Sequence, residues 1–201
     1  ELGYKTNLTK GYYYAAIYHR STNGTITRIA TQAPPSTLIY TVFQNAGYSS
    51  NTGVEMVFQQ NFSKAFSFNS NVNIYRNIIN AFTVENKYPV LSIYTAGKEA
   101  ITSGNVKLNG IFHLPKKTDV QLTAIYLAPD IIPQGRIDTR FSVDMGIKKQ
   151  IQKDKGELFF NASDIFNTLR IKKTVTGNGF TLASTDYYET QVIRLGYSYK
   201  F

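Results

Sequence analysis

Charged residues of both signs recur at alternate positions within one short stretch of the chain. Arg136, Asp138, Arg140 and Asp144 fall on the same side of an extended segment, because successive side chains of a strand point to opposite faces. Glu55 and Arg194 stand in similar alternating segments. These six residues are the candidate contacts for a polar ligand or for a further protein domain. The alternative is that cross-strand charges neutralise one another on a wet surface.

Residue types that carry catalysis are sparse. The two histidines, His19 and His113, lie on different predicted strands, and no Ser or Asp pair beside a histidine marks a hydrolase. The absence of cysteine excludes disulfides and thiolate metal sites. We therefore expect a protein that is not an enzyme and that uses no cofactor or metal ion.

Composition narrows the class further. Aromatic residues make up 14% of the chain, with Tyr 15 and Phe 13, yet no run of eighteen apolar residues occurs, which excludes a transmembrane helix. The net charge is +9, but the basic residues do not gather on one helix or run, so we expect no binding to nucleic acid. An aromatic-rich chain of this kind is either a soluble β-sandwich or a membrane β-barrel, whose alternating strands dilute the hydropathy.

A period of two runs through most of the sequence and predicts strands with two unlike faces. The last segment is the clearest case: one face of it is apolar and the other is mostly polar. The apolar face consists of Ile193, Leu195, Tyr197, Tyr199 and Phe201. Elsewhere the polar face carries a row of asparagines, Asn69, Asn71 and Asn73, and asparagine is a poor strand former in soluble sheets. A water-filled lumen explains such a face better than a packed core.

The connections between these segments alternate between short turns and longer links. Lysine-bearing turns lie at 9–10, 63–64, 115–117 and 152–155, and the longer links lie at 33–38, 78–98, 129–134 and 174–179. We predict nine strands, at 1–8, 11–32, 39–62, 65–77, 99–114, 118–128, 135–151, 156–173 and 180–201. Outer-membrane barrels have short periplasmic turns and longer external loops, so the short turns should be periplasmic. We also expect local bulges near Asn23-Gly24 and Ala46-Gly47.

Several stretches resemble the TonB-dependent receptor barrels and the related outer-membrane β-barrel family. They are Glu1-Leu2-Gly3-Tyr4-Lys5, the segment from Tyr13-Tyr14 to Gly24-Thr25-Ile26, Gln44 to Met56, Asn161-Ala162-Ser163-Asp164-Ile165-Phe166-Asn167-Thr168, and the closing Gly196-Tyr197-Ser198-Tyr199-Lys200-Phe201. The resemblance covers nearly the whole chain. It implies an all-β antiparallel transmembrane β-barrel, with residues 1–201 forming the C-terminal segment of a 22-stranded barrel in the bacterial outer membrane. The plug domain and the earlier strands would lie outside this chain.

The resemblance also implies a function and partners. The barrel would take part in TonB-dependent uptake of an iron chelate, cobalamin or an oligosaccharide, contacting its own plug domain and, through the plug, TonB. The apolar face of the last segment, Ile193, Leu195, Tyr197, Tyr199 and Phe201, would face the lipid and be read by the barrel assembly machinery. In the external segment 78–98, Lys87, Tyr88 and Tyr94 are possible ligand contacts, although ordinary loop residues would look the same.

Two alternatives remain at this point. A small self-contained outer-membrane barrel, structural or adhesive, would have eight or ten strands and a closed ladder. A soluble β-sandwich binding module would pack the Ile193–Phe201 face against a second sheet.

Overall fold

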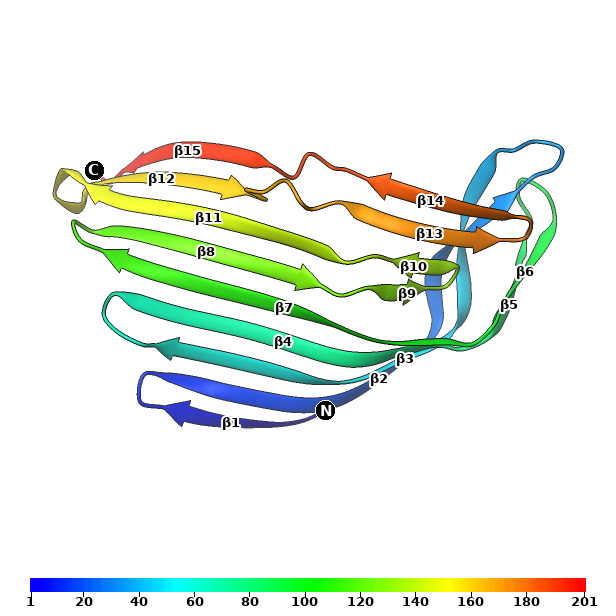
Figure 1. Cartoon of the computed structure of the whole chain (residues 1–201), viewed down its shortest axis with the longest axis horizontal. Helices are drawn as coiled ribbons and strands as arrows, with labels where there is room; N and C mark the ends of the chain where they lie inside the picture. The colour runs from blue at the N-terminus through cyan, green and yellow to red at the C-terminus, as the bar shows by residue number, and fades with distance from the viewer.

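The computed structural model describes residues 1–201 and consists almost entirely of antiparallel strands (Figure 1). Nine of them form one sheet in the order β1-β2-β3-β4-β7-β8-β11-β12-β15, as the sequence predicted. Their bounds are β1 (Leu2–Leu8), β2 (Gly11–Gln32), β3 (Ile39–Asn61), β4 (Phe66–Ile79), β7 (Glu99–Leu114), β8 (Thr118–Leu127), β11 (Arg140–Ile151), β12 (Gly156–Ser163) and β15 (Val192–Tyr199). No helix is long and apolar enough to cross a lipid bilayer.

The sheet does not close on itself in this structure. β1 pairs only with β2, and β15 pairs only with β12, so both are edge strands. The predicted count of 22 strands finds no support here. The self-contained barrel required eight or ten strands in a closed ladder, and that pattern is not observed either.

Beyond the nine-stranded sheet, two small sheets stand at the end where the longer links lie, which we call the loop end; the opposite end is the turn end (Figure 1). One small sheet contains β9 (Asp130–Ile132), β10 (Gly135–Ile137), β13 (Ile171–Gly177) and β14 (Phe180–Asp186), and the other is the hairpin of β5 (Phe82–Asn86) and β6 (Ser92–Ala96). The predicted links 78–98, 129–134 and 174–179 thus contain strand. The predicted continuous strands 135–151, 156–173 and 180–201 are each broken in two.

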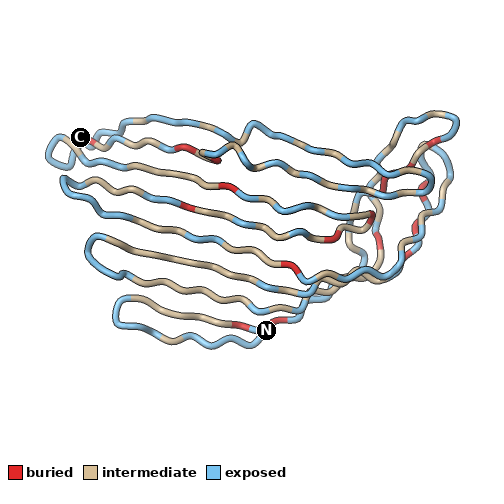
Figure 2. The backbone as a smooth tube through the Cα atoms, viewed as in Figure 1, coloured by how far each residue is buried: buried red, intermediate tan, exposed pale blue.

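The nine-stranded sheet is a single layer with two different faces. Only 18 of 201 residues are buried, and Figure 2 shows that most of the sheet is exposed or half-buried. On β15, the outer side chains Ile193, Leu195 and Tyr197 are 69%, 79% and 50% exposed, and no second sheet covers them. This contradicts the soluble sandwich, in which that face would be packed.

Register keeps each face uniform across the strands, because directly paired residues of antiparallel strands lie on the same face. Ile17 lies opposite Val54, and Val54 lies opposite Ile74, on the apolar face. On the polar face, Glu55 lies opposite Asn73 and Asn73 opposite Asn105. Near the turn end, the apolar face carries a cluster of aromatic rings: Phe58, Phe62, Phe66, Phe68 and Phe112.

The long β2–β3 hairpin bends where two glycines oppose each other. Gly24 and Gly47 have φ of 62° and 58°, a region that favours glycine. The pairing on either side is in register, with Asn23 opposite Tyr48 and Thr25 opposite Ala46, so no extra residue is inserted. The predicted bulges are therefore wrong: these residues form a symmetric bend.

Past this bend, residues 24–47 form what we call the crossing ribbon. It sweeps across the loop end, and β2 reaches β13, although five strands separate β2 from β12 in the sheet (Figure 1). Its Ile29 and Ala46 pack with Phe82 and Val84 of the β5–β6 hairpin in a small buried cluster. The ribbon is thereby held by hydrophobic burial as well as by its own ladder.

The break after β12 is made by a buried aspartate. Asp164 is 1% exposed, and its carboxylate accepts hydrogen bonds from the backbone N–H groups of Thr168 (2.9 Å) and Leu169 (3.0 Å) and from the Thr190 hydroxyl (2.6 Å). Asp164 and Asn167 have φ of 44° and 52°, which the side-chain bonds stabilise. Burial alone would raise the pKa of Asp164. The hydrogen bonds from Thr190, Thr168 and Leu169 together lower it by more, so the pKa of Asp164 lies below its ordinary value.

Replacing Asp164 by Ala should destabilise the protein by roughly 3 kcal/mol, because buried N–H groups lose their acceptor. Asp154→Ala is the control: this exposed residue pairs only with Lys117 in a turn, and its loss should cost little. Denaturant unfolding of the full-length protein in detergent measures both. Because the folded pKa of Asp164 is lowered, its contribution is present at neutral pH and is lost only as the pH falls through that pKa. Equal stability of the two variants would contradict this role.

Candidate functional site

The polar face of the sheet is lined by side-chain amides and hydroxyls that bond one another across the strands. The Tyr18 hydroxyl donates to Asn73 Oδ1 (2.8 Å), and Asn71 Nδ2 donates to Glu55 Oε1 (3.1 Å). Nearer the loop end, Tyr75 and Asn77 donate to the two carboxylate oxygens of Asp130 (2.7 and 2.8 Å). The face therefore offers mainly neutral donors and acceptors, with single charges between them.

The six predicted contact residues lie on this face or continue from it, but they do not form one cluster. Glu55 and Arg140 are at opposite ends of one cross-strand row, four strand steps and roughly 19 Å apart. Arg194 lies on the edge strand β15, opposite Asn161. None of the six belongs to an ion pair in the structure, which argues against mutual neutralisation.

One of the six has a local structural role. Asp144 Oδ1 accepts a hydrogen bond from the Asp164 N–H (2.8 Å), so this carboxylate supports the bend after β12. Arg140 is half-buried, and its Nε has no hydrogen-bond partner. The other pair, Arg136 and Asp138, lines a pocket at the loop end.

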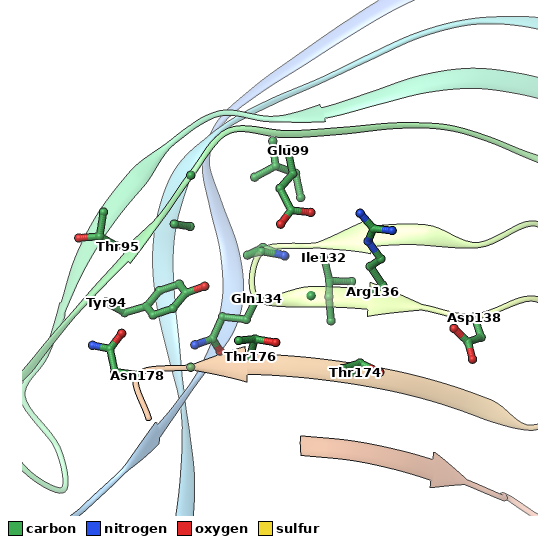
Figure 3. Close-up of a pocket in the computed structure, with 16 residues that line it drawn as sticks. Tyr94, Thr95, Glu99, Ile132, Gln134, Arg136, Asp138, Thr174, Thr176 and Asn178 are labelled. Atoms are coloured by element: carbon green, nitrogen blue, oxygen red, sulfur yellow. The ribbon is translucent and has the colours of Figure 1, made fainter. Parts of the chain in front are cut away.

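This pocket has a volume of about 600 Å³, within the range of small-molecule sites. It lies between the β6–β7 link, the β9–β10 hairpin and β13 (Figure 3). Its polar lining includes Tyr94, Thr95, Glu99, Gln134, Arg136, Asp138, Thr174, Thr176 and Asn178. In Figure 3, Arg136 and Glu99 project into the space between β10 and the start of β7. The pocket thus combines one aromatic ring, several hydroxyls and amides, and charges of both signs.

Tyr94 presents the only aromatic ring of this pocket. The ring packs on Phe82, with centroids 6.1 Å apart, and burial together with the nearby Glu99 carboxylate raises the pKa of the phenol. The hydroxyl therefore stays protonated at neutral pH and can donate a hydrogen bond. Of the other predicted loop contacts, Tyr88 stacks edge-on against Tyr40 (6.2 Å) and lies with Lys87 outside the pocket.

Gln134 ties the pocket to the crossing ribbon. Its side chain is 4% exposed, accepts a hydrogen bond from the Ala30 N–H (2.6 Å) and donates one to the Ala30 carbonyl (3.0 Å). A second buried tie joins the ribbon to β5, because Asn86 Nδ2 donates to the Thr31 hydroxyl (2.6 Å). On its other side, Gly135 allows the β9–β10 hairpin to lie close to β13: a Cβ there would stand 1.9 Å from the Thr174 carbonyl oxygen. The pocket wall and the ribbon are therefore one connected structure.

The histidines are exposed and remote from this pocket. His19 Nδ1 bonds the Thr52 hydroxyl and His113 Nδ1 bonds Asp119, each at 2.8 Å. No group of three or more His, Cys, Asp or Glu residues is positioned to hold a metal ion.

Sequence reasoning missed Glu99, Gln134, Thr174, Thr176 and Asn178 as pocket residues. Most of them stand in segments that look like ordinary polar links. Gln134, between Pro133 and Gly135, carries a turn pattern but no indication of the residue it bonds. The segments that line the pocket are distant from one another in sequence, and Gln134 also bonds Ala30, 104 positions away.

Replacing Gln134 by Ala should release the crossing ribbon, because two buried backbone groups of Ala30 lose their partners. We expect the Ala30 amide to exchange hydrogen at least about tenfold faster in the full-length protein. Asn178→Ala is the matched control, since it removes one exposed bond to the Ile93 carbonyl from the same pocket. An unchanged exchange rate at Ala30 in the Gln134 variant would show that the hydrogen bonds between Gln134 and the Ala30 backbone do not hold the ribbon.

Comparison with known proteins gives one finding. A family model described as an outer membrane protein beta-barrel family matches residues 1–199. No curated protein and no solved structure matches the chain.

Proposed function

The chain belongs to the outer membrane protein beta-barrel family, and from this premise we propose that it forms part of the wall of an outer-membrane receptor that takes up a polar ligand by TonB-dependent transport. The observation that carries the proposal is the one-layer sheet whose polar face leads to a polar pocket at the loop end. The family supports an outer-membrane location, and it leaves the transport step as our inference.

Membrane insertion explains the two faces. A lipid environment covers the apolar face without a second protein layer, and a lumen hydrates the polar face. The short turns then face the periplasm and the loop end faces outward. β2 and β3, with 22 and 23 residues, are about twice the length needed to cross a bilayer, so they carry the crossing ribbon into the external medium.

The polar face is also where a plug domain would lie if this wall belongs to a 22-stranded barrel. Glu55, with its amide neighbours, and Arg194 are the residues we assign to such contacts. Because they form no ion pair with one another, their charges remain available to a partner.

Among iron chelates, cobalamin and oligosaccharides, the pocket chemistry favours an oligosaccharide. Hydroxyl and amide groups from Thr174, Thr176 and Asn178 can exchange hydrogen bonds with sugar hydroxyls, and the Tyr94 ring can lie against a sugar face. Arg136 is the one cation of the pocket and is accompanied by two carboxylates, which is a poor match for a multiply anionic chelate.

The ligand proposal is tested by Tyr94→Ala in the full-length receptor. We expect about a tenfold weaker affinity for an oligosaccharide in calorimetric titration, as for the loss of an aromatic contact. Tyr88→Ala, on the same hairpin but outside the pocket, should bind as the unmodified protein does. Uptake of the same sugar should stop in cells lacking TonB. Uptake that persists there would refute the transport step, and equal affinities of the two variants would refute the pocket.

We also propose that the barrel assembly machinery reads the apolar face of β15 and the residues after it. Phe201 stacks edge-on against Tyr199 at 5.4 Å, and both are exposed. Phe201→Ala should reduce the amount of folded protein in the outer membrane, measured by heat-dependent gel mobility. Phe166→Ala, which removes another exposed aromatic ring, should leave that amount unchanged. A similar decrease in both variants would argue for a general loss of apolar surface.

A further inference from the structure

The apolar face is interrupted by one polar cross-strand row toward the loop end. Ile17, Val54 and Ile74 form the apolar row before it, and Ile78 of β4 lies beyond it. Two residues farther along each strand, the same face carries His19, Thr52, Arg76 and Thr102, which are again paired directly. The change from hydrocarbon to polar side chains thus takes one step of about 7 Å along the strands. In the proposed orientation, this row lies where the acyl chains of the outer leaflet meet the headgroups.

The face is hollowed at this boundary. A depression of about 730 Å³ is lined by both rows, with Leu2, Ile17, Val54 and Ile74 on one side and His19, Thr52, Arg76 and Thr102 on the other. The lining of this hollow is apolar on one side and polar on the other, so a molecule with an apolar part and a polar part can fill it.

The polar part of the hollow is cationic. Arg76 is exposed, donates to the Thr102 hydroxyl (3.3 Å) and has no acidic partner. The one carboxylate of the lining belongs to Glu1, which turns to the opposite face, where it bonds Tyr14 (2.9 Å) and lies 3.9 Å from Arg20. The guanidinium of Arg76 therefore keeps free donors, in a geometry that suits the oxygens of a phosphate.

We propose that this hollow binds one phosphorylated lipid of the outer leaflet. The phosphate lies against Arg76, with hydroxyls of Thr52 and Thr102 and the His19 ring beside it, and an acyl chain lies over Val54 and Ile74. This goes beyond ligand uptake and depends only on contact between the apolar face and lipid. The apolar floor selects a lipid over a free phosphate ion, which has nothing to bury there.

Native mass spectrometry of the detergent-solubilised full-length protein tests the proposal with three probes: a phosphatidic acid, the diacylglycerol with the same chains, and inorganic phosphate. We expect phosphatidic acid to bind more tightly than diacylglycerol and to resist competition by inorganic phosphate. Added salt should weaken the phosphate contact, since it is exposed. If inorganic phosphate displaces the lipid, the hollow is a simple anion site and the lipid proposal is wrong.

Arg76→Gln should weaken phosphatidic acid binding about tenfold, and Arg76→Lys should restore part of it. Arg20→Gln is the matched control, because Arg20 is exposed on the opposite face of β2, which lies two strands from β4 in the sheet. Thr102→Val, which keeps the side-chain shape, gives a second and smaller loss. Binding by Arg76→Gln at the unmodified level, or an equal loss in Arg20→Gln, would overturn the proposal. The assay measures no uptake, so failure of the transport proposal would leave its result intact.

Discussion

The cross-strand ladder of backbone hydrogen bonds is the interaction on which the rest of this structure depends, because a single-layer sheet has no second layer to hold it. Of 121 backbone–backbone hydrogen bonds, 109 lie within the strands. In lipid these bonds are obligatory, since no water is present to pair a free N–H or C=O group. The ladder also fixes register, so it decides which side chains face outward. A shift by one residue in β4 would exchange Asn73 and Ile74 between the two faces.

Fixed register explains how one chain can present an apolar exterior and a row of amides a few ångströms away. Asn73 of β4 is opposed by Glu55 and Asn105 on the same face, and the bonds that join Asn73 to Tyr18 and Asn71 to Glu55 reach across the strands. The same rule places the boundary between Ile74 and Arg76 at one level on four neighbouring strands. Side chains that alternate along each single strand thus form continuous apolar and polar surfaces only because the strands pair in this register.

The sequence predicted the nine strands of the main sheet because turn residues and period-two alternation are local features. It failed where the structure is decided by distant contacts. The alternation from Arg136 to Lys148 looks continuous, yet it is broken at Asp138 between β10 and β11. The bend at which the ribbon begins requires Gly24 opposite Gly47. The sequence shows only that glycines occur at these two positions, and this is equally compatible with a bulge. Gln134 bonds a backbone 104 positions away, and no period contains that information.

The crossing ribbon has a consequence for what reaches the polar face. It spans from the side of β3 to β13 and so crosses the loop end of the sheet. In the proposed barrel, a molecule that enters from the loop end would therefore meet the ribbon before it meets the asparagine rows. For the proposed uptake, the width and flexibility of the ligand would then matter as well as its binding strength, because a thin, flexible chain can pass an obstacle that stops a rigid body of equal mass.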